Sequence, residues 1–136
     1  MRGRTGVPRD SPRIYNRMVK VNHIFGNIQV FHKDLPSGRD YNRYKSLCLA
    51  LRGDGWRIPT IGELSYLYDL HTLRILGFDH FGSYFSSTNT INSLGQVKEH
   101  IVQCIYFGDG TLIGGSTLTY KDNFLVRPVR DISYVL

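Results

Sequence analysis

One segment predicts most clearly where a helix begins: Gly55-Trp56-Arg57-Ile58-Pro59-Thr60-Ile61-Gly62-Glu63-Leu64. Thr60 followed three residues later by Glu63 is a capping box, in which each side chain bonds the backbone N–H of the other residue. Pro59, directly before Thr60, keeps the chain extended up to the cap. We therefore predict a helix that starts at Thr60 and runs to about Leu76, where Gly77 ends it.

Trp56 and Arg57 precede the cap, on a short extended segment between two predicted helices. Neighbouring side chains of a strand point to opposite faces, so these two residues have different surroundings. We expect Trp56 to be a large apolar anchor of the core, and Arg57 on the other face to bond loop carbonyls. In this interpretation Trp56, Arg57, Thr60 and Glu63 are structural residues, which identify a fold and not a ligand.

Periodicity and turn residues predict the other elements. A helix is expected over 41–51, because apolar residues recur on one face at Tyr44, Leu47, Cys48 and Leu51. A hairpin turning at Gly26-Asn27 is expected from strands over 18–25 and 28–32. Later strands are expected over 84–88, 101–107, 111–114 and 124–129, with polar loops over 34–40, 89–96 and 115–123. Helices confined to one part of a chain beside antiparallel strands indicate the α+β class.

Several motifs follow one another in a specific order. A helix with Cys48 precedes the quoted stretch, and the strand Tyr84-Phe85-Ser86-Ser87-Thr88 follows it. Next come the hairpin Phe107-Gly108-Asp109-Gly110 and a last strand over 124–130. Together these segments resemble the bacterial and phage branch of the C-type-lectin-like fold, which carries a Gly-Trp-Arg-(Ile/Leu)-Pro-Thr signature. The resemblance covers about residues 24 to 131. It implies two helices packed on antiparallel strands with long late loops.

The cysteines depart from the pattern of that family. Its members often have a second cysteine where Pro128 stands, which can pair with the helix cysteine, and often a tryptophan where Phe85 stands. In this chain the second cysteine is Cys104, in a different strand. We therefore expect Cys48 and Cys104 to be two buried thiols, which also fits a protein assembled in a reducing cytosol.

Positive charge is concentrated at the start of the chain. The protein has 136 residues, a mass of 15.6 kDa and a formal net charge of +6. Residues 1–20 hold six basic side chains and one acidic one, together with two prolines and two glycines. We interpret 1–20 as a basic, extended N-terminal arm and 21–136 as one lectin-like domain. The arm residues assigned to assembly are Arg2, Arg4, Arg9, Arg13, Tyr15 and Arg17.

The arm has three interpretations: a solvated tail, a segment that docks on a protein partner, and a nucleic-acid contact. Interleaved apolar residues favour docking over nucleic acid, because a purely solvated or phosphate-binding arm has no use for them at that density. They are Ile14, Tyr15, Met18 and Val19. We therefore expect other subunits of a larger assembly to be the partners of the arm.

Several classes of protein are not expected. No apolar run has the length of a membrane span, and Met1 to Arg13 does not have the form of a secretory signal peptide. The tripeptides that bind calcium and sugar in the lectin-like fold do not occur, and the five histidines show no ligand spacing. Neither a nucleophile elbow nor a phosphate loop is found. We therefore predict no catalytic residue, no metal and no cofactor.

The two late polar loops are the candidate ligand surface, because loops over a rigid sheet tolerate variation and meet ligands in many folds. Amide and tyrosine side chains there suit a sugar or a protein surface, and they equally suit a solvated loop. The candidate ligand-binding residues are Asn89, Asn92, Gln96, Tyr120, Asp122 and Asn123.

The resemblance implies a non-enzymatic binding or assembly module. Similar domains occur in surface adhesins and in phage attachment proteins. A lectin-like chain without a signal peptide fits a phage virion component, such as a spike, fibre or decoration protein, that is assembled in the cytoplasm. It would contact other virion proteins or a host glycan or surface protein. The alternatives are an intracellular subunit whose basic arm binds nucleic acid or a ribonucleoprotein, and a cell-surface protein exported by another route.

Overall fold

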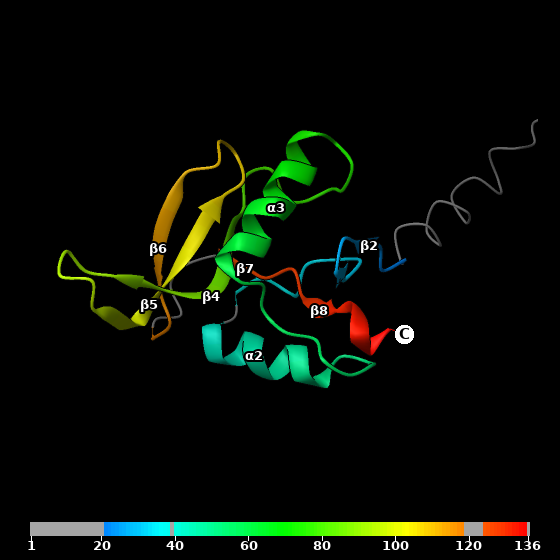
Figure 1. Cartoon of the computed structure of the whole chain (residues 1–136), viewed down its shortest axis with the longest axis horizontal. Coiled ribbons are helices and arrows are strands. Elements are labelled where there is room, and N and C mark those ends of the chain that lie inside the picture. The colour runs from blue at the N-terminus through cyan, green and yellow to red at the C-terminus, as the bar shows by residue number, and fades with distance from the viewer. Residues whose placement is uncertain (1–20, 39, 119–123, 136) are drawn as a thin grey trace, which may run out of the picture.

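The computed structural model describes residues 21–38, 40–118 and 124–135. The predicted arm, residues 1–20, lies outside this range. The described chain is of the α+β class, as predicted, with two α-helices and two sheets (Figure 1). Its elements are β2 (Ile24–Phe25), β3 (Ile28–Val30), α2 (Tyr41–Ala50), α3 (Ile61–Thr72), β4 (Ser83–Ile91), β5 (Val97–Tyr106), β6 (Leu112–Ser116), β7 (Phe124–Leu125), β8 (Val129–Asp131) and a 3-10 turn (Ile132–Tyr134).

The larger sheet is mixed, which corrects the expectation of antiparallel strands alone. Its strand order is β6-β5-β4-β7, and β7 pairs with β4 in parallel, with Ser83 opposite Phe124. The smaller sheet has the order β2-β3-β8 and is antiparallel. The parallel pair has a topological cause: β6 and β7 lie at opposite edges of the larger sheet and run in the same direction, so the order of the strands includes a crossover.

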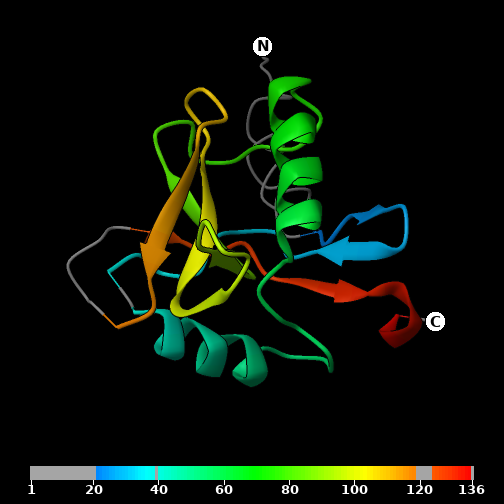
Figure 2. The same ribbon diagram turned by 60° about the vertical axis from the view of Figure 1, so that its left-hand side comes forward.

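The two helices cover opposite faces of the larger sheet. Alternation along β4 shows this directly, because Phe85 packs in one apolar cluster with Tyr44 and Cys48 of α2. Its neighbour Tyr84 packs in a second cluster with Leu64 and Leu67 of α3. Successive residues of a strand point to opposite faces, so β4 separates the two halves of the core. Figures 1 and 2 show α2 and α3 on either side of these strands.

Trp56 is the anchor that the sequence predicts. Its side chain is 2% exposed, and the indole Nε1–H donates to the carbonyl of Arg52 at 3.0 Å. The ring meets Phe31 edge-on at a centroid distance of 5.1 Å, and the guanidinium of Arg130 lies 4.7 Å from its centroid. Gly55, with a φ of +86°, supplies the left-handed turn that brings the chain into this position.

The segment 55–64 also pairs with the C-terminal strand β8. Arg57 and Val129 exchange two backbone hydrogen bonds, of 2.8 and 2.9 Å, in an antiparallel bridge. The capping box is confirmed, since Thr60 accepts from Glu63 N–H and Glu63 accepts from Thr60 N–H. The extended segment therefore connects α2, α3 and β8.

Several boundaries differ from the predictions. The helix α3 ends at Thr72 and not at Leu76, because Arg74 adopts a φ of 59° and the N–H groups of Ile75 and Leu76 turn back to the carbonyl of Leu70. The predicted last strand is divided into β7 and β8, which belong to different sheets. The first strand of the predicted hairpin is short in the described chain, since β2 comprises Ile24–Phe25, and residues 18–20 lie outside the described range.

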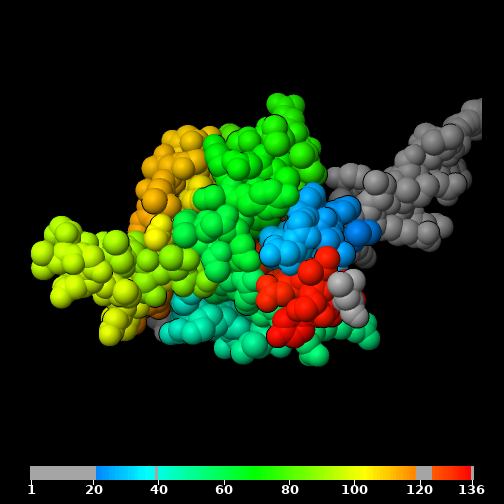
Figure 3. Space-filling view, viewed as in Figure 1, coloured from blue at the N-terminus to red at the C-terminus, as the bar shows by residue number. Residues whose placement is uncertain are grey.

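The predicted loop over 89–96 begins later than expected, because residues 89–91 are strand and only 92–96 form the turn. β4 continues to Ile91 and β5 begins at Val97, and these two residues are paired. The amide of Asn89 explains this length, because it donates to the carbonyls of Lys98, Glu99 and Ile101 across the hairpin. Figure 3 shows the far end of this hairpin projecting from the body of the domain.

A buried ion pair lies where the loops of the domain meet. The Arg127 side chain donates through Nε to Asp34 Oδ1 at 2.9 Å and through a terminal nitrogen to the carbonyl of Gly77 at 3.1 Å. The hydroxyl of Tyr84 donates to the other oxygen of Asp34 at 2.7 Å. Phe78 packs its ring 4.3 Å from the guanidinium carbon. The guanidinium charge of Arg127 is therefore paired with the Asp34 carboxylate inside the domain.

Both cysteines are buried thiols, as predicted: Cys48 lies on α2 and Cys104 on β5. Neither of the two described helices is long and apolar enough to cross a bilayer.

Replacing Trp56 tests the fold. We expect Trp56→Ala to lower the free energy of unfolding by about 3–5 kcal/mol, because a buried ring is removed and a cavity is left at the junction of α2, α3 and β8. Urea unfolding followed by circular dichroism measures the loss. Trp56→Phe is the control: it keeps a ring against Phe31 and loses the bond to Arg52, so we expect a cost of about 1–2 kcal/mol. A loss below about 1 kcal/mol for Trp56→Ala contradicts the anchor role.

Candidate functional site

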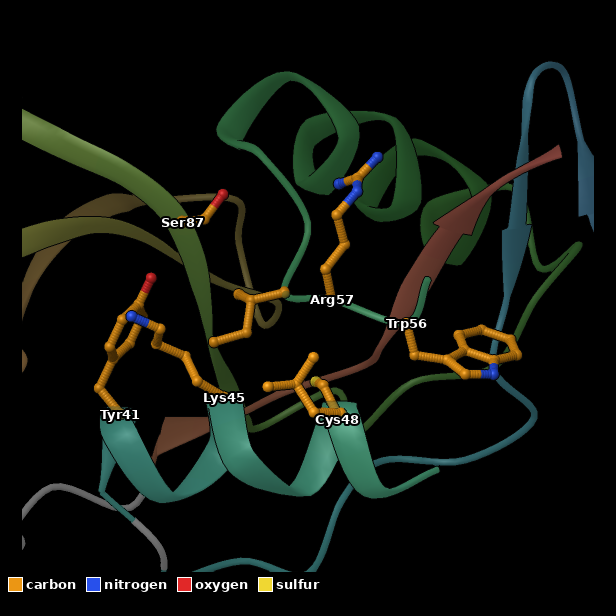
Figure 4. Close-up of a pocket in the computed structure, with 8 residues that line it drawn as sticks. Tyr41, Lys45, Cys48, Trp56, Arg57 and Ser87 are labelled. Carbon is orange, nitrogen blue, oxygen red and sulfur yellow. The ribbon is translucent and has the colours of Figure 1, made fainter. Parts of the chain in front are cut away.

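Two adjoining hollows run beside α2 and form the candidate site. The first is an apolar pocket of about 230 Å³, and the second is a wider hollow of about 500 Å³. Tyr41, Lys45 and Ser87 line both, so the two are continuous. We call the whole feature the α2 groove. Figure 4 shows its narrow part, between α2 and the extended segment that carries Trp56 and Arg57.

The narrow pocket has apolar walls. Cys48 and Leu49 of α2 lie on one side, and Trp56 and Ile58 of the extended segment lie on the other. Burial raises the pKa of the Cys48 thiol to about 11, so the group is protonated at neutral pH and serves as a wall and not as a nucleophile. Leu49 is 82% exposed, although it is a large apolar residue. The pocket thus opens onto an uncovered apolar rim.

Three polar side chains stand where the narrow pocket meets the wider hollow. Tyr41 and Lys45 come from successive turns of α2, and Ser87 comes from β4 (Figure 4). The Lys45 ammonium lies 6.0 Å from the centroid of the Tyr41 ring, and Phe85 meets that ring edge-on at 5.2 Å. Burial, with a smaller effect of the two buried cysteines, raises the pKa of Tyr41, so its hydroxyl stays neutral.

Within the described part of the chain, Lys45 borders the groove without an ion pair to a carboxylate. Arg57 also borders the narrow pocket, but its side chain points toward the start of α3 (Figure 4). It donates to both oxygens of Glu63, at 2.6 and 2.8 Å, and to Asp131 at 2.8 Å. This corrects the expectation that Arg57 bonds loop carbonyls. Lys45 makes no ion pair with any residue in the described ranges.

The wider hollow has mixed walls, with Asn89 from β4, Glu99 and His100 from β5, and Leu118 beyond β6. Ser87 and His100 both border it, yet no hydrogen bond joins them in the described structure. A nucleophile needs a base within hydrogen-bond reach to be activated. The arrangement therefore offers polar contacts and not a nucleophile–base pair.

The predicted ligand residues are dispersed. Asn89 borders the groove, although its amide nitrogen is used within the hairpin. Asn92 and Gln96 lie at the hairpin tip and bond each other at 3.0 Å, away from the groove. Tyr120, Asp122 and Asn123 lie outside the described residues, as do Arg2, Arg4, Arg9, Arg13, Tyr15 and Arg17 of the arm. A ligand role for these residues stays a prediction.

The sequence contains one signal for the groove that the prediction does not use. Leu49 falls off the apolar face that predicts the helix over 41–51, so a large apolar side chain was to be expected on the solvent side. Ser87 lies 42 positions from Lys45 along the chain, and no local pattern connects the two. Their juxtaposition follows only from the packing of α2 on the sheet.

The histidines also differ from expectation. The sequence shows no paired spacing, but the fold brings His71 Nε2 within 3.2 Å of His80 Nδ1. Partial burial and the neighbouring His80 lower the pKa of His71. Within the described ranges, no three side chains of the metal-binding types His, Cys, Asp and Glu come together around one point.

Stability at low pH tests the Arg57–Glu63 pair. Burial raises the pKa of Glu63, but hydrogen bonds from Arg57 and from the Thr60 backbone outweigh it and leave this pKa below its ordinary value. A lowered carboxyl pKa stabilises the folded state above the unfolded pKa, of about 4.3, and this stabilisation is lost as pH falls through the folded value. Glu63→Gln should thus be less stable than wild type at pH 6, and the two free energies of unfolding should converge toward pH 3. Parallel pH profiles in urea unfolding contradict this.

Comparison with known proteins gives no match: no family model, no curated protein and no solved structure is similar to this chain. A function is therefore inferred from the α2 groove and from the order of the sequence motifs.

Proposed function

We propose that the chain is a non-enzymatic binding and assembly module whose α2 groove contacts a partner. The observation that carries the proposal is the groove itself, in which an apolar pocket with the exposed rim residue Leu49 adjoins Lys45, a cation with no ion-pair partner among the described residues. A mostly apolar pocket with a few polar groups at its edge is the usual form of a binding site.

A C-type-lectin-like fold is part of this proposal. The order of the elements supports it: a cysteine-bearing helix, the buried Trp56 segment, a capped second helix and late strands. Ser86, in the aromatic-Ser-Ser-Thr strand, accepts from the N–H of Thr88, and Thr88 accepts from the N–H of Ile61. These bonds join the signature stretch to β4, as a fold-defining motif should.

The chemistry of the groove supports binding and not catalysis. Its thiol has a pKa raised to about 11, and its serine has no bonded base among the described residues. Arg57, which would otherwise polarise a substrate, is engaged by Glu63 and Asp131. The side chains therefore provide shape, one positive charge and neutral hydrogen-bonding groups.

Following the resemblance, we place the module in a phage virion, as a spike, fibre or decoration protein that contacts other virion proteins or the host surface. In this proposal, residues 1–20 dock on neighbouring subunits, because apolar side chains are interspersed among the basic ones there. The same basic residues favour one alternative, a subunit that binds nucleic acid or a ribonucleoprotein through its N-terminal segment.

A charged substitution on the groove rim tests the binding role. We expect Leu49→Arg to fold normally, because the side chain is exposed, and to reduce either incorporation of the tagged full chain into particles or adsorption of those particles to host cells by at least about tenfold. Leu73→Arg is the matched control, since Leu73 is 67% exposed and lies outside the groove. Density-gradient sedimentation and an adsorption assay provide the two readouts. Wild-type behaviour of Leu49→Arg in both overturns the proposal.

Truncation distinguishes the two proposed roles of residues 1–20, docking on protein subunits and binding of nucleic acid. Deletion of residues 1–17 should leave the domain folded and prevent its incorporation into particles. The nucleic-acid alternative instead expects normal incorporation, together with tight binding of the full chain to DNA or RNA at low salt that collapses by about 200 mM. Filter binding at two salt concentrations distinguishes the two.

A further inference from the structure

We infer that the group entering the α2 groove belongs to a protein partner: an extended peptide segment in which a bulky apolar side chain stands next to a carboxylate. This inference rests on the proposed function, because it names the chemistry of the partner at that same site. It depends on three features of the groove: its apolar pocket, the position of Lys45, and the ring of Tyr41, which Lys45 and Phe85 contact.

The narrow pocket fits an apolar side chain. Its volume of about 230 Å³ exceeds the roughly 150 Å³ of an apolar cavity that binds benzene, so it can hold a phenyl ring with its methylene. Cys48, Ile58 and the Trp56 side chain supply walls that offer little hydrogen bonding. A hydroxylated group placed there would lose its bonds to water without replacement, and this is costly. Leu49, on the rim, would cover the same apolar group.

Lys45 indicates a carboxylate beside that group. Its ammonium stands where the narrow pocket meets the wider hollow, and it has no ion-pair partner among the described residues. The neutral hydroxyls of Tyr41 and Ser87 border the same junction and can donate to an anionic oxygen. An anion bound there would lie directly next to whatever fills the apolar pocket.

A sugar fits the groove less well than a peptide. Protein–sugar contacts generally use the open face of an aromatic ring, and Tyr41 is the aromatic residue at the junction. Its ring is buried, with the Lys45 ammonium over it and Phe85 against it. The wider hollow, with Asn42, Glu99, His100 and Thr117 on its walls, instead suits the N–H and C=O groups of a peptide backbone, which need hydrogen-bond partners when covered.

Short peptides test the inference on the full chain by NMR titration of its backbone amides. The probe is N-acetyl-Ala-Phe-Asp-Ala-amide, and we expect it to shift the amide signals of Tyr41, Lys45 and Ser87. Replacing its Asp by Asn should raise Kd about two- to fivefold, which is the range for an exposed ion pair. Replacing its Phe by Ala should raise Kd by roughly tenfold or more, because burial of the ring is lost.

Two variants keep the test specific. In Lys45→Gln the difference between the Asp and Asn peptides should disappear, whereas Lys33→Gln, which removes an exposed lysine outside the groove, should retain it. Equal affinities of the two peptides for the wild-type chain, or shifts confined to residues outside the groove, overturn the inference. So does sialyllactose shifting the groove signals when no peptide does, since this assigns the groove to sugars.

The failure of this inference is distinguishable from the failure of the proposed function. If Leu49→Arg abolishes incorporation or adsorption but no peptide shifts the groove signals, the binding role stands and the peptide chemistry is wrong. If the peptides bind with the expected pattern while Leu49→Arg particles behave as wild type, the groove binds peptides but has no part in assembly or attachment.

Discussion

The domain depends on one buried cation. Arg127 is 5% exposed and joins three loops, since it bonds Asp34 before α2 and Gly77 after α3 and itself lies between β7 and β8. Tyr84 completes the pairing of Asp34 from the centre of the larger sheet. Removing one partner of such a pair leaves an uncompensated charge in the interior, which is more destabilising than the pair is stabilising. The positions of α2 and α3 on the two faces of the sheet are thus tied to one point, and the walls of the α2 groove are held with them.

Local signals account for the parts of the fold that the sequence predicts. The capping box of Thr60 and Glu63, the apolar periodicity of α2 and the Gly26-Asn27 turn each depend on residues a few positions apart. Burial of Trp56 follows from its size and its place between two helices. By contrast, the β4–β5 hairpin is joined by a longer-range contact, since the amide nitrogen of Asn89 lies within hydrogen-bond distance of three carbonyls about ten residues away. Polar composition alone makes that region resemble a loop.

The site was less predictable than the fold, because its parts come from distant segments. Lys45 and Leu49 lie on the solvent side of α2, whereas the apolar periodicity that predicts this helix comes from its buried side. Ser87 belongs to β4, a strand that the sequence predicts from its core residues. The ion pairing of Arg57 could not be predicted either, since its partner Asp131 is 74 positions away in the chain. The predicted loop amides stay a prediction, and the groove between α2 and the sheet is a second candidate that needed the structure to be seen. The His71–His80 contact arises in the same way, from the turn that ends α3 early.

The crossover between β6 and β7 determines the order in which the protein can fold during synthesis. The larger sheet lacks its β7 edge until residues 124–125 exist, and the smaller sheet lacks β8 until residues 129–131 exist. Val126 and Val129, both inaccessible to solvent, fill one half of the core each. Residues 124–131 must therefore leave the ribosome before either core can close. Contacts of such large sequence separation slow folding, so we expect closure of the two cores to be a late step.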